Sequence, residues 1–173
     1  MKLSELLADL PHKLVQGDPD VRVTTLTYDS RSVVPHSAFV ALTGYVTDGH
    51  HHIAEAIERG ASAVVVQDPT EVQNFSTVIE VENSRVALAK MSSNYFSNPS
   101  AHLKLIGITG TNGKTSVTDF CRQIWNFYGL KSASIGTLGI RDTSEQYYHK
   151  IRNNLTTLDS SELNKQLSKL YDK

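Results

Sequence analysis

The first hundred residues alternate between short apolar runs and segments that repeat apolar residues at helical spacing. Four runs are apolar or β-branched, as buried strands are: 21–27, 38–42, 63–66 and 77–81. Three segments have helical spacing: 3–10, 53–59 and 84–96. Pro11 ends the first helix, Gly60 is suited to the left-handed position after the second, and Asn83 is a suitable N-cap for the third. Alternating strands and helices over this length predict a small α/β domain.

The polar, proline-containing stretch 97–102 predicts a domain boundary, giving domains at 1–98 and 99–173. Beyond it the pattern predicts, in order, a strand at 103–108, a glycine-rich turn, a helix at 115–128, a strand at 132–135 and a polar loop or hairpin at 141–152. A last helix follows, for which Asp159-Ser160-Ser161-Glu162 offers N-capping groups. The strands at 103–108 and 132–135, with the helix between them, are expected to form a βαβ unit, which would begin a parallel-sheet domain. One face of the helix carries its apolar residues: Val117, Phe120, Cys121, Ile124, Phe127 and Tyr128.

Composition narrows the class of protein. The 173 residues include 17 basic and 18 acidic side chains, and this near-neutral balance argues against a nucleic-acid backbone or an anionic membrane as partner. With 39% hydrophobic and 20% charged residues the chain is expected to be globular. No apolar run is long enough to span a bilayer and no secretory signal is visible. A single cysteine fits a reducing cytosol, so we expect a cytoplasmic protein. We also expect a monomer.

The strongest chemical signal is the glycine-rich turn before the helix at 115–128. Its residues are Gly110, Thr111, Asn112, Gly113, Lys114, Thr115 and Ser116. Glycines let backbone N–H groups approach phosphate oxygens, and the helix start directs further N–H groups at the same anion. Lys114 would contact the β- and γ-phosphates and the Thr115 hydroxyl would coordinate Mg²⁺. Ile108 replaces the first glycine of the strict pattern, so the alternative is an ordinary turn with an incidental lysine; the context favours nucleotide binding.

Four segments together resemble the Mur ligase family. Residues 108–116 resemble its phosphate loop, GTNGK followed by Ser or Thr, which folylpolyglutamate synthetases share. Three more are similar to the tripeptide synthetase branch and follow the family's order: Asp29-Ser30-Arg31 with Val33 and Pro35, Gly44 with Asp48-Gly49-His50, and Asn153-Asn154-Leu155-Thr156-Thr157. The resemblance covers nearly the whole chain.

The resemblance implies an ATP-dependent amide ligase of peptidoglycan precursor synthesis, which adds the third amino acid to UDP-N-acetylmuramoyl-L-alanyl-D-glutamate. ATP phosphorylates the terminal carboxylate and the incoming amine displaces phosphate. It further implies that 110–116 hold ATP and Mg²⁺, and that the substrate contacts Tyr28, Ser30, Tyr45, Val46 and Thr47 at its uridine diphosphate end and Thr156 and Thr157 at its muramoyl peptide. No catalytic residue is assigned, and the identity of the third amino acid stays open.

Several of these residues have a purely structural reading. Asp29 followed by Ser30 and Arg31 is by itself an ordinary Asx turn. The three histidines at 50–52 invite a metal site, but consecutive histidines rarely converge on one ion, so a solvated loop is expected. Cys121 lies on the apolar helix face and is expected to be a buried small hydrophobe, not a nucleophile.

The sequence departs from the family pattern in two ways. Leu158 follows the paired threonines where the family commonly has proline. The family's enzymes have three domains, and we expect this chain to end inside the second, lacking a carboxylate that shares Mg²⁺, a carbamoylated lysine and the domain that selects the amino acid. The chain is then the N-terminal part of a ligase, inactive alone. The alternatives are a truncated homologue that binds UDP-linked metabolites or docks on a full-length ligase, and a folylpolyglutamate-type enzyme.

Overall fold

A computed structural model describes the chain except at 45–47, 73–74, 76, 144–146 and 150–157. The chain divides into two compact units, Met1–Pro99 and Ser100–Lys173, each of which is considered by itself. The boundary that the sequence predicts falls after residue 98, next to this division. Among the described residues no helix is both long enough and apolar enough to cross a membrane.

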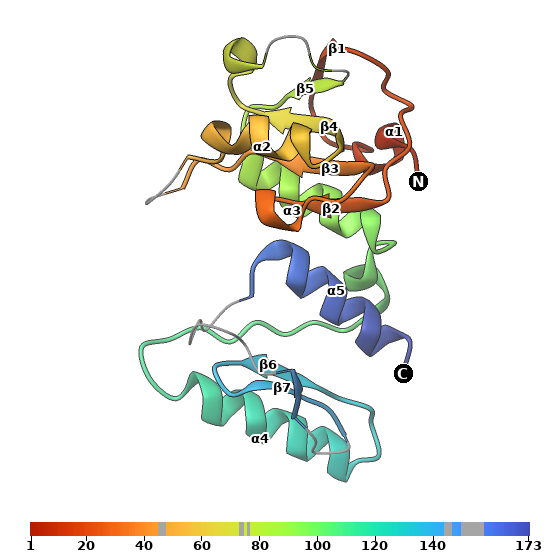
Figure 1. The fold of residues 1–173 in the computed structure, drawn as a ribbon. Helices are drawn as coiled ribbons and strands as arrows, with labels where there is room; N and C mark the ends of the chain where they lie inside the picture. Colours follow the sequence, from red (N-terminus) through yellow and green to blue (C-terminus); the bar gives the residue numbers. More distant parts are fainter. Residues whose placement is uncertain (45–47, 73–74, 76, 144–146, 150–157) are drawn as a thin grey trace. The chain divides into compact units, whose positions relative to one another are not determined.

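The first unit is built on a five-stranded sheet (Figure 1). Its strands are β1 Lys13–Gln16, β2 Thr25–Thr27, β3 Ser37–Val40, β4 Ala61–Val66 and β5 Val78–Glu80. They lie in the order β1-β5-β4-β3-β2. The four strands from β2 to β5 are parallel, and β1 pairs antiparallel with β5. The carboxyl ends of the parallel strands therefore meet at one edge of the sheet.

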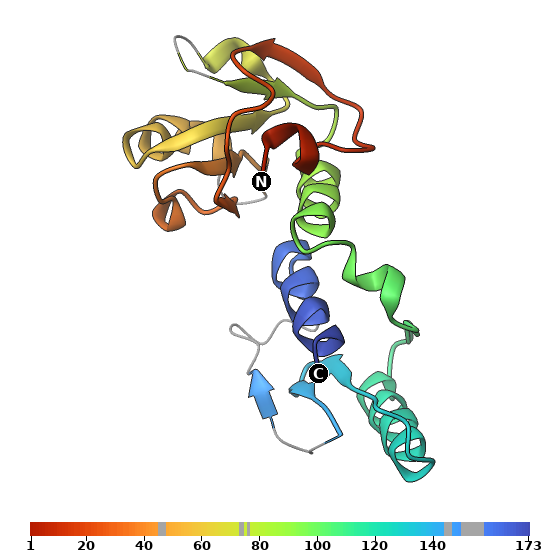
Figure 2. The ribbon, with the colours of Figure 1, turned by 90° about the vertical axis from the view of Figure 1, so that its right-hand side faces the viewer.

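Helices bury both faces of this sheet (Figures 1 and 2). Strand β3 is buried at every position, and its residues alternate between two cores. Ala38 and Val40 pack with α1 (Leu3–Leu6) and α3 (Ser84–Tyr95), whereas Phe39 packs with α2 (Ile53–Glu58). A strand covered on both sides is apolar throughout, which explains the continuous apolar runs in the sequence.

Local sequence signals predict most of this unit, and the α/β fold is confirmed. Helix α2 ends before Gly60, whose φ of +95° is the left-handed conformation expected there. Asn83 caps α3, because its side-chain oxygen accepts hydrogen bonds from the backbone N–H groups of Arg85 and Val86 at 3.0 and 3.1 Å. The strand predicted at 21–27 is shorter, limited to β2, and the edge strand β1 was not predicted because its exposed residues show no alternation.

The second unit combines two helices with a small antiparallel sheet. Its elements are α4 Lys114–Phe127, β6 Ser134–Gly136, β7 Gly139–Arg141, β8 Tyr147–His149 and α5 Ser160–Tyr171. The strand order is β6-β7-β8. For the segment 141–152 the hairpin alternative is the one observed, since β8 pairs with β7. Asp159 caps α5 as expected, accepting a hydrogen bond from the Glu162 N–H at 2.9 Å.

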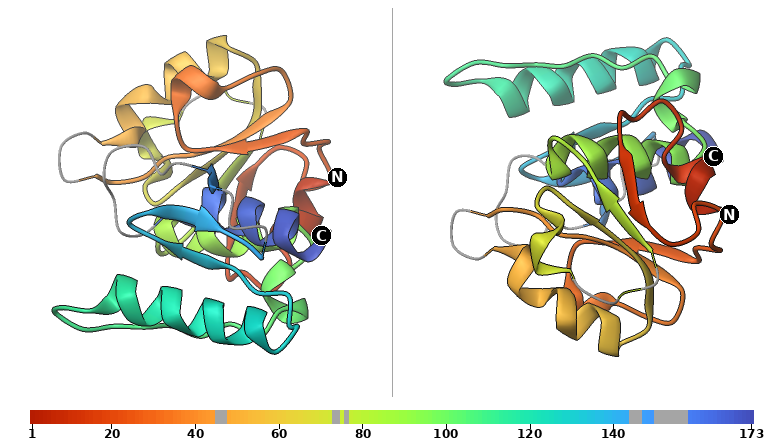
Figure 3. Two further views of the ribbon diagram at one scale, coloured as in Figure 1. Left: turned by 90° about the horizontal axis from the view of Figure 1, so that it is seen from below. Right: turned by 90° about the horizontal axis from the view of Figure 1, so that it is seen from above.

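The strand predicted at 103–108 is absent, and with it the βαβ unit (Figure 3). Residues 104–110 have no regular secondary structure, and no strand of the described residues pairs with them. Leu105 and Ile106 are 56% and 64% exposed. A parallel strand exists only where neighbouring strands supply its hydrogen bonds. The strand was predicted from apolar sequence alone, and it does not form because no neighbouring strand among the described residues pairs with this segment.

The apolar face of α4 is also exposed, and the predicted burial of Cys121 on it is wrong. Phe120, Ile124 and Phe127 are 61%, 54% and 87% exposed, and Cys121 is half-buried instead of buried. The buried side chain of this helix is that of Arg122. The helix forms where its periodicity predicts, but its apolar side has no cover among the described residues.

Helix α4 is fixed instead by a polar cluster. The Arg122 guanidinium donates to the Asp119 carboxylate at 3.0 and 3.1 Å and to the backbone carbonyl of Asp142 at 3.3 Å. Arg141 lies 3.5 Å from the same carboxylate. Burial raises the pKa of Asp119, but hydrogen bonds from Arg122 and Gln123 outweigh it and leave the pKa below its usual value. The cluster joins α4 to the strand β7 and the residue that follows it.

Candidate functional site

The first candidate site begins at the turn directly after β2. The Asp29 carboxylate accepts hydrogen bonds from the backbone N–H of Arg31 at 3.0 Å and from its guanidinium at 2.9 Å. These bonds close the expected Asx turn, which continues as a single 3₁₀ turn, Ser30–Ser32. The guanidinium of Arg31 lowers the pKa of Asp29, so the turn carries an ionised carboxylate at neutral pH.

Ser30 is held from helix α2. Its hydroxyl donates a hydrogen bond to the Glu55 carboxylate at 2.7 Å, and the other oxygen of that carboxylate accepts from Arg59 Nε at 3.0 Å. Ser30 is buried, with 7% of its surface exposed, whereas Tyr28 is 39% exposed. Sequence reasoning missed Glu55 and Arg59; their four-residue spacing on a helix was the available signal.

The two ends of the loop after β3 are joined by backbone contacts. The Gly49 N–H donates to the Leu42 carbonyl at 2.8 Å, and Thr43 forms an isolated bridge with Asp48. Gly49 has no room for a side chain, because a Cβ there would lie 2.6 Å from the Leu42 nitrogen. The expected substrate residues Tyr45, Val46 and Thr47 lie outside the described residues.

His50 anchors the end of this loop and is buried, so the expectation of a solvated histidine is wrong for it. Its Nδ1 lies 2.6 Å from the Asp48 carboxylate, and its Nε2 accepts from the backbone N–H of Gln67 at 3.3 Å. Since an N–H can only donate, these partners assign the proton to Nδ1. Hydrogen bonds from His50 lower the pKa of Asp48. His51 and His52 are exposed, as expected of a loop.

These residues converge on the edge where ligands bind in open α/β sheets. The turn at Ser30 follows β2 and the loop at 42–49 follows β3, and these two strands are parallel neighbours. Because both segments leave the carboxyl ends of adjacent strands, they meet at the same edge of the sheet. The sequence-predicted residues Tyr28 and Ser30 are therefore brought to the base of the loop that carries the other three.

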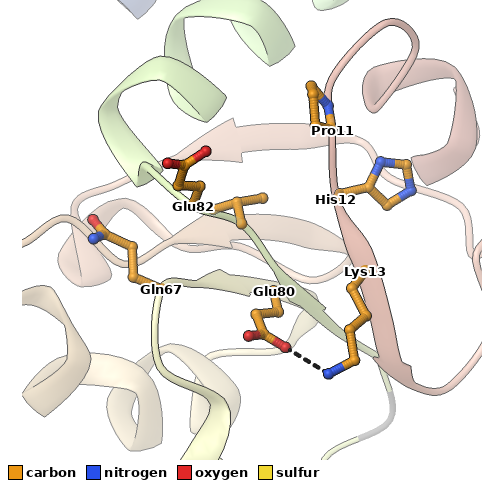
Figure 4. Close-up of a pocket in the computed structure, with 7 residues that line it drawn as sticks. Pro11, His12, Lys13, Gln67, Glu80 and Glu82 are labelled. Atoms are coloured by element: carbon orange, nitrogen blue, oxygen red, sulfur yellow. Dashed lines mark hydrogen bonds and ion pairs between the residues drawn. The ribbon is translucent and has the colours of Figure 1, made fainter.

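A shallow hollow of about 470 Å³ lies at the carboxyl ends of β4 and β5, beside the start of β1 (Figure 4). It is lined by Pro11, His12, Lys13, Gln67, Glu80, Val81 and Glu82. Lys13 forms an ion pair with Glu80 at 3.0 Å across the β1–β5 pairing. The side-chain oxygen of Gln67 accepts from the backbone N–H and the hydroxyl of Ser84. Lys13 and Glu80 pair with each other and the Gln67 amide oxygen is used by Ser84, so we assign this hollow no role.

The second candidate site is the turn before α4. Gly110 and Gly113 have φ values of +149° and +77°, which L side chains rarely adopt. Helix α4 starts at Lys114, and no side chain caps its N-terminus. The Lys114 ammonium donates to the carbonyls of Gly110 and Thr111, 2.6 and 3.3 Å away. The lysine thus folds back over its own loop.

This turn fits a nucleotide phosphate and its Mg²⁺ ion. Uncapped N–H groups at the start of α4 are free to donate to an anion, and glycine at both ends keeps the approach open. Thr115 is exposed, so its hydroxyl is available to a metal ion. Lys114 must leave its two carbonyls to contact a phosphate. Thr156 and Thr157, expected to hold the muramoyl peptide, lie outside the described residues.

Comparison with known proteins identifies both halves of the chain. Residues 22–106 match the family described as the Mur ligase family, catalytic domain, and residues 108–173 match the Mur ligase middle domain. A UDP-N-acetylmuramoyl-L-alanyl-D-glutamate--2,6-diaminopimelate ligase of Clostridium perfringens is 39% identical over 90% of this chain and 34% of its own length. A ligase of the same description from Clostridium acetobutylicum is 41% identical over 100% of this chain and 35% of its own length. The chain spans about a third of these relatives.

Solved structures support the fold. A UDP-N-acetylmuramoyl-L-alanyl-D-glutamate--2,6-diaminopimelate ligase superposes with a TM-score of 0.77 at 22% identity, covering 99% of this chain and 34% of that one. MurF from Acinetobacter baumannii gives a TM-score of 0.59 at 24% identity, over 73% of this chain and 27% of its own. With both family matches placed in succession along the sequence, this chain belongs to the Mur ligase family.

Proposed function

We propose that this chain forms the uridine-binding and ATP-binding part of a peptidoglycan tripeptide ligase. The observation that carries the proposal is the phosphate turn at the start of α4, with two left-handed glycines, an uncapped helix end and Lys114 folded over the loop. The relatives named above join 2,6-diaminopimelate to UDP-N-acetylmuramoyl-L-alanyl-D-glutamate according to their descriptions. The substrate proposed here is the same UDP-linked dipeptide.

ATP supplies the phosphoryl group that turns the terminal carboxylate into an acyl phosphate, from which an attacking amine nitrogen expels phosphate and loses a proton. The chain's own contribution is positioning and charge. Lys114 turns from the loop carbonyls to the β- and γ-phosphates, the α4 N–H groups donate to the same oxygens, and Thr115 coordinates Mg²⁺. In the first unit, Tyr28, Ser30 and the loop residues 45–47 hold the uridine diphosphate end; Thr156 and Thr157, which belong to the second unit, hold the muramoyl peptide.

The chain spans about a third of the length of its relatives. Binding of the two ligands and ligation of the substrate are therefore two separate proposals. The 173-residue chain is expected to bind the uridine ligand and the nucleotide without turnover. A second acidic group is needed to clamp the metal ion during phosphoryl transfer, and we propose that it belongs to the part of the relatives that this chain does not span. The proposed setting is the cytoplasm.

The direct test is nucleotide binding by the purified chain and by Lys114→Ala, measured by calorimetry with ATP and Mg²⁺. We expect Lys114→Ala to weaken binding by at least about tenfold, because it removes a cation from the phosphates. Lys104→Ala, a change at an exposed lysine that precedes the loop, is the matched control. Equal ATP affinity for the unaltered chain and Lys114→Ala would contradict the assignment of the phosphate loop. Ligation at an enzyme-like rate by the 173 residues would contradict the proposed inactivity.

A further inference from the structure

The contact between Ser30 and Glu55 fixes which way the Ser30 hydroxyl points. Ser30 Oγ lies 2.7 Å from Glu55 Oε2, in the geometry of a hydrogen bond donated by serine. An ionised carboxylate has only acceptor sites, so the shared proton must come from the hydroxyl. The single proton of Ser30 is then used, and two lone pairs remain on its oxygen.

The surroundings keep Glu55 ionised. Arg59 donates to its other oxygen at 3.0 Å, and His52 Nδ1 lies 3.7 Å from Oε2. The hydrogen bond from Ser30 and the charge of Arg59 lower the pKa of Glu55. Arg59 is itself fixed, because its guanidinium also donates to the backbone carbonyl of Arg31 at 3.4 Å. Glu55 therefore cannot return a proton to Ser30 at neutral pH.

The free side of the Ser30 oxygen has no donor within the part of the chain that the structure describes. The residue retains 7% of its surface exposed, at the sheet edge where the turn after β2 meets the base of the loop after β3. A ligand group that reaches this oxygen meets an acceptor. Phosphate oxygens are acceptors too, and are disfavoured there.

We infer that Glu55 is a positioning residue that presents the Ser30 oxygen as a hydrogen-bond acceptor, so that this position of the site selects a donor group of the bound nucleoside. The inference rests on the proposed function, since it takes the ligand to be a uridine diphosphate. We take the donor to be one of two groups of that ligand: the imide N3–H of the base or the 2′-hydroxyl of the ribose, the hydroxyl nearer the base. The first would also distinguish uracil from cytosine, whose N3 is an acceptor.

The test measures dissociation constants of UDP, CDP, N3-methyl-UDP and 2′-deoxy-UDP for the whole chain by calorimetry. If the imide donates to Ser30, CDP and N3-methyl-UDP bind at least about tenfold more weakly than UDP, because two facing acceptors leave a buried group unpaired. If the ribose 2′-hydroxyl donates, 2′-deoxy-UDP binds more weakly than UDP instead. Equal affinity for all four nucleotides would overturn the inference while leaving UDP binding intact.

Variants then test the part played by Glu55. In Glu55→Gln the amide N–H is able to donate to Ser30, which frees the hydroxyl to rotate, so we expect discrimination to fall to within about threefold with UDP still bound. Glu58→Gln, an exposed carboxylate of the same helix, is the matched control and should keep full discrimination. Full discrimination in Glu55→Gln would refute the positioning role. If Glu55→Gln does not fold, the four-nucleotide comparison on the unaltered chain decides alone. Failure of the unaltered chain to bind UDP would overturn the proposed uridine site itself and this inference with it.

Discussion

Replacing Gly49 with alanine tests how tightly the loop after β3 is held. An added Cβ would lie 2.6 Å from the nitrogen and 2.9 Å from the oxygen of Leu42, and 3.2 Å from the Ala41 carbonyl carbon. All three atoms are backbone, so no side chain can rotate away. Gly49 is not in the left-handed region, so φ itself would tolerate alanine. The cost in the folded state therefore comes from the close approach to the backbone at 41–42 and not from φ.

The size of that cost follows from what must move. Overpacking of this kind costs about 1–3 kcal/mol, and a shift that breaks the 2.8 Å hydrogen bond from Gly49 to Leu42 adds about 1 kcal/mol. Alanine recovers about 0.4–1 kcal/mol by restricting the unfolded chain. The expected net loss is about 1–4 kcal/mol in the free energy of unfolding of the first unit.

Urea unfolding followed by the amide NMR signals of β3 and β4 measures this loss without interference from the second unit. Gly107→Ala is the control, because nothing lies within 4 Å of a Cβ at Gly107; it should shift the unfolding free energy of the first unit by less than about 0.5 kcal/mol. A Gly49→Ala protein as stable as the unaltered chain would refute the close approach of the two backbones.

Three further predictions concern stability. Arg122→Ala should destabilise the second unit by about 2–4 kcal/mol, since it leaves the Asp119 carboxylate without its principal buried partner; fluorescence of Trp125 during denaturation measures this, and no change would refute the polar cluster. Phe127→Ser should change the stability of the second unit by less than about 0.5 kcal/mol in the Trp125 experiment, whereas Phe39→Ala, fully buried, should cost the first unit about 3–5 kcal/mol, measured by the amide NMR signals of β4 during urea unfolding; equal losses would contradict the two burial states. The pKa of Asp48 is lowered by folding, so its contribution exists above its ordinary pKa and disappears as pH falls through the folded value. Unfolding of the first unit between about pH 5 and 2 should therefore show a weaker pH dependence in Asp48→Asn, and an unaltered slope would count against the His50 contacts.

The elements that sequence reasoning located are those with local causes. Asn83 and Asp159 are caps that act within three residues, and Gly60 ends α2 through its own φ. The failures depend on distant partners. An apolar run such as 103–108 becomes a strand only when other strands pair with it, and the apolar side of α4 is buried only when something covers it.

The candidate site divides in the same way. The candidate phosphate-binding turn could be predicted from the sequence because its two glycines, its lysine and the start of the helix lie within seven consecutive residues, 110–116. The link from Ser30 to Glu55 spans 25 residues and the link from His50 to Gln67 spans 17, and both arise from packing of α2 and β4 around the sheet edge. A run of three histidines gives no indication that its first member is buried and the others are exposed.

The central claim is that each unit carries its own ligand site, and an amide NMR titration of the whole chain with UDP and then with ATP and Mg²⁺ tests it most directly. We predict that UDP shifts the signals of the turn at 29–32 and of residues 48–50, and that ATP with Mg²⁺ shifts those of 110–116. UDP shifts confined to the hollow around Lys13 and Glu80, or ATP shifts that spare Lys114, would contradict the account.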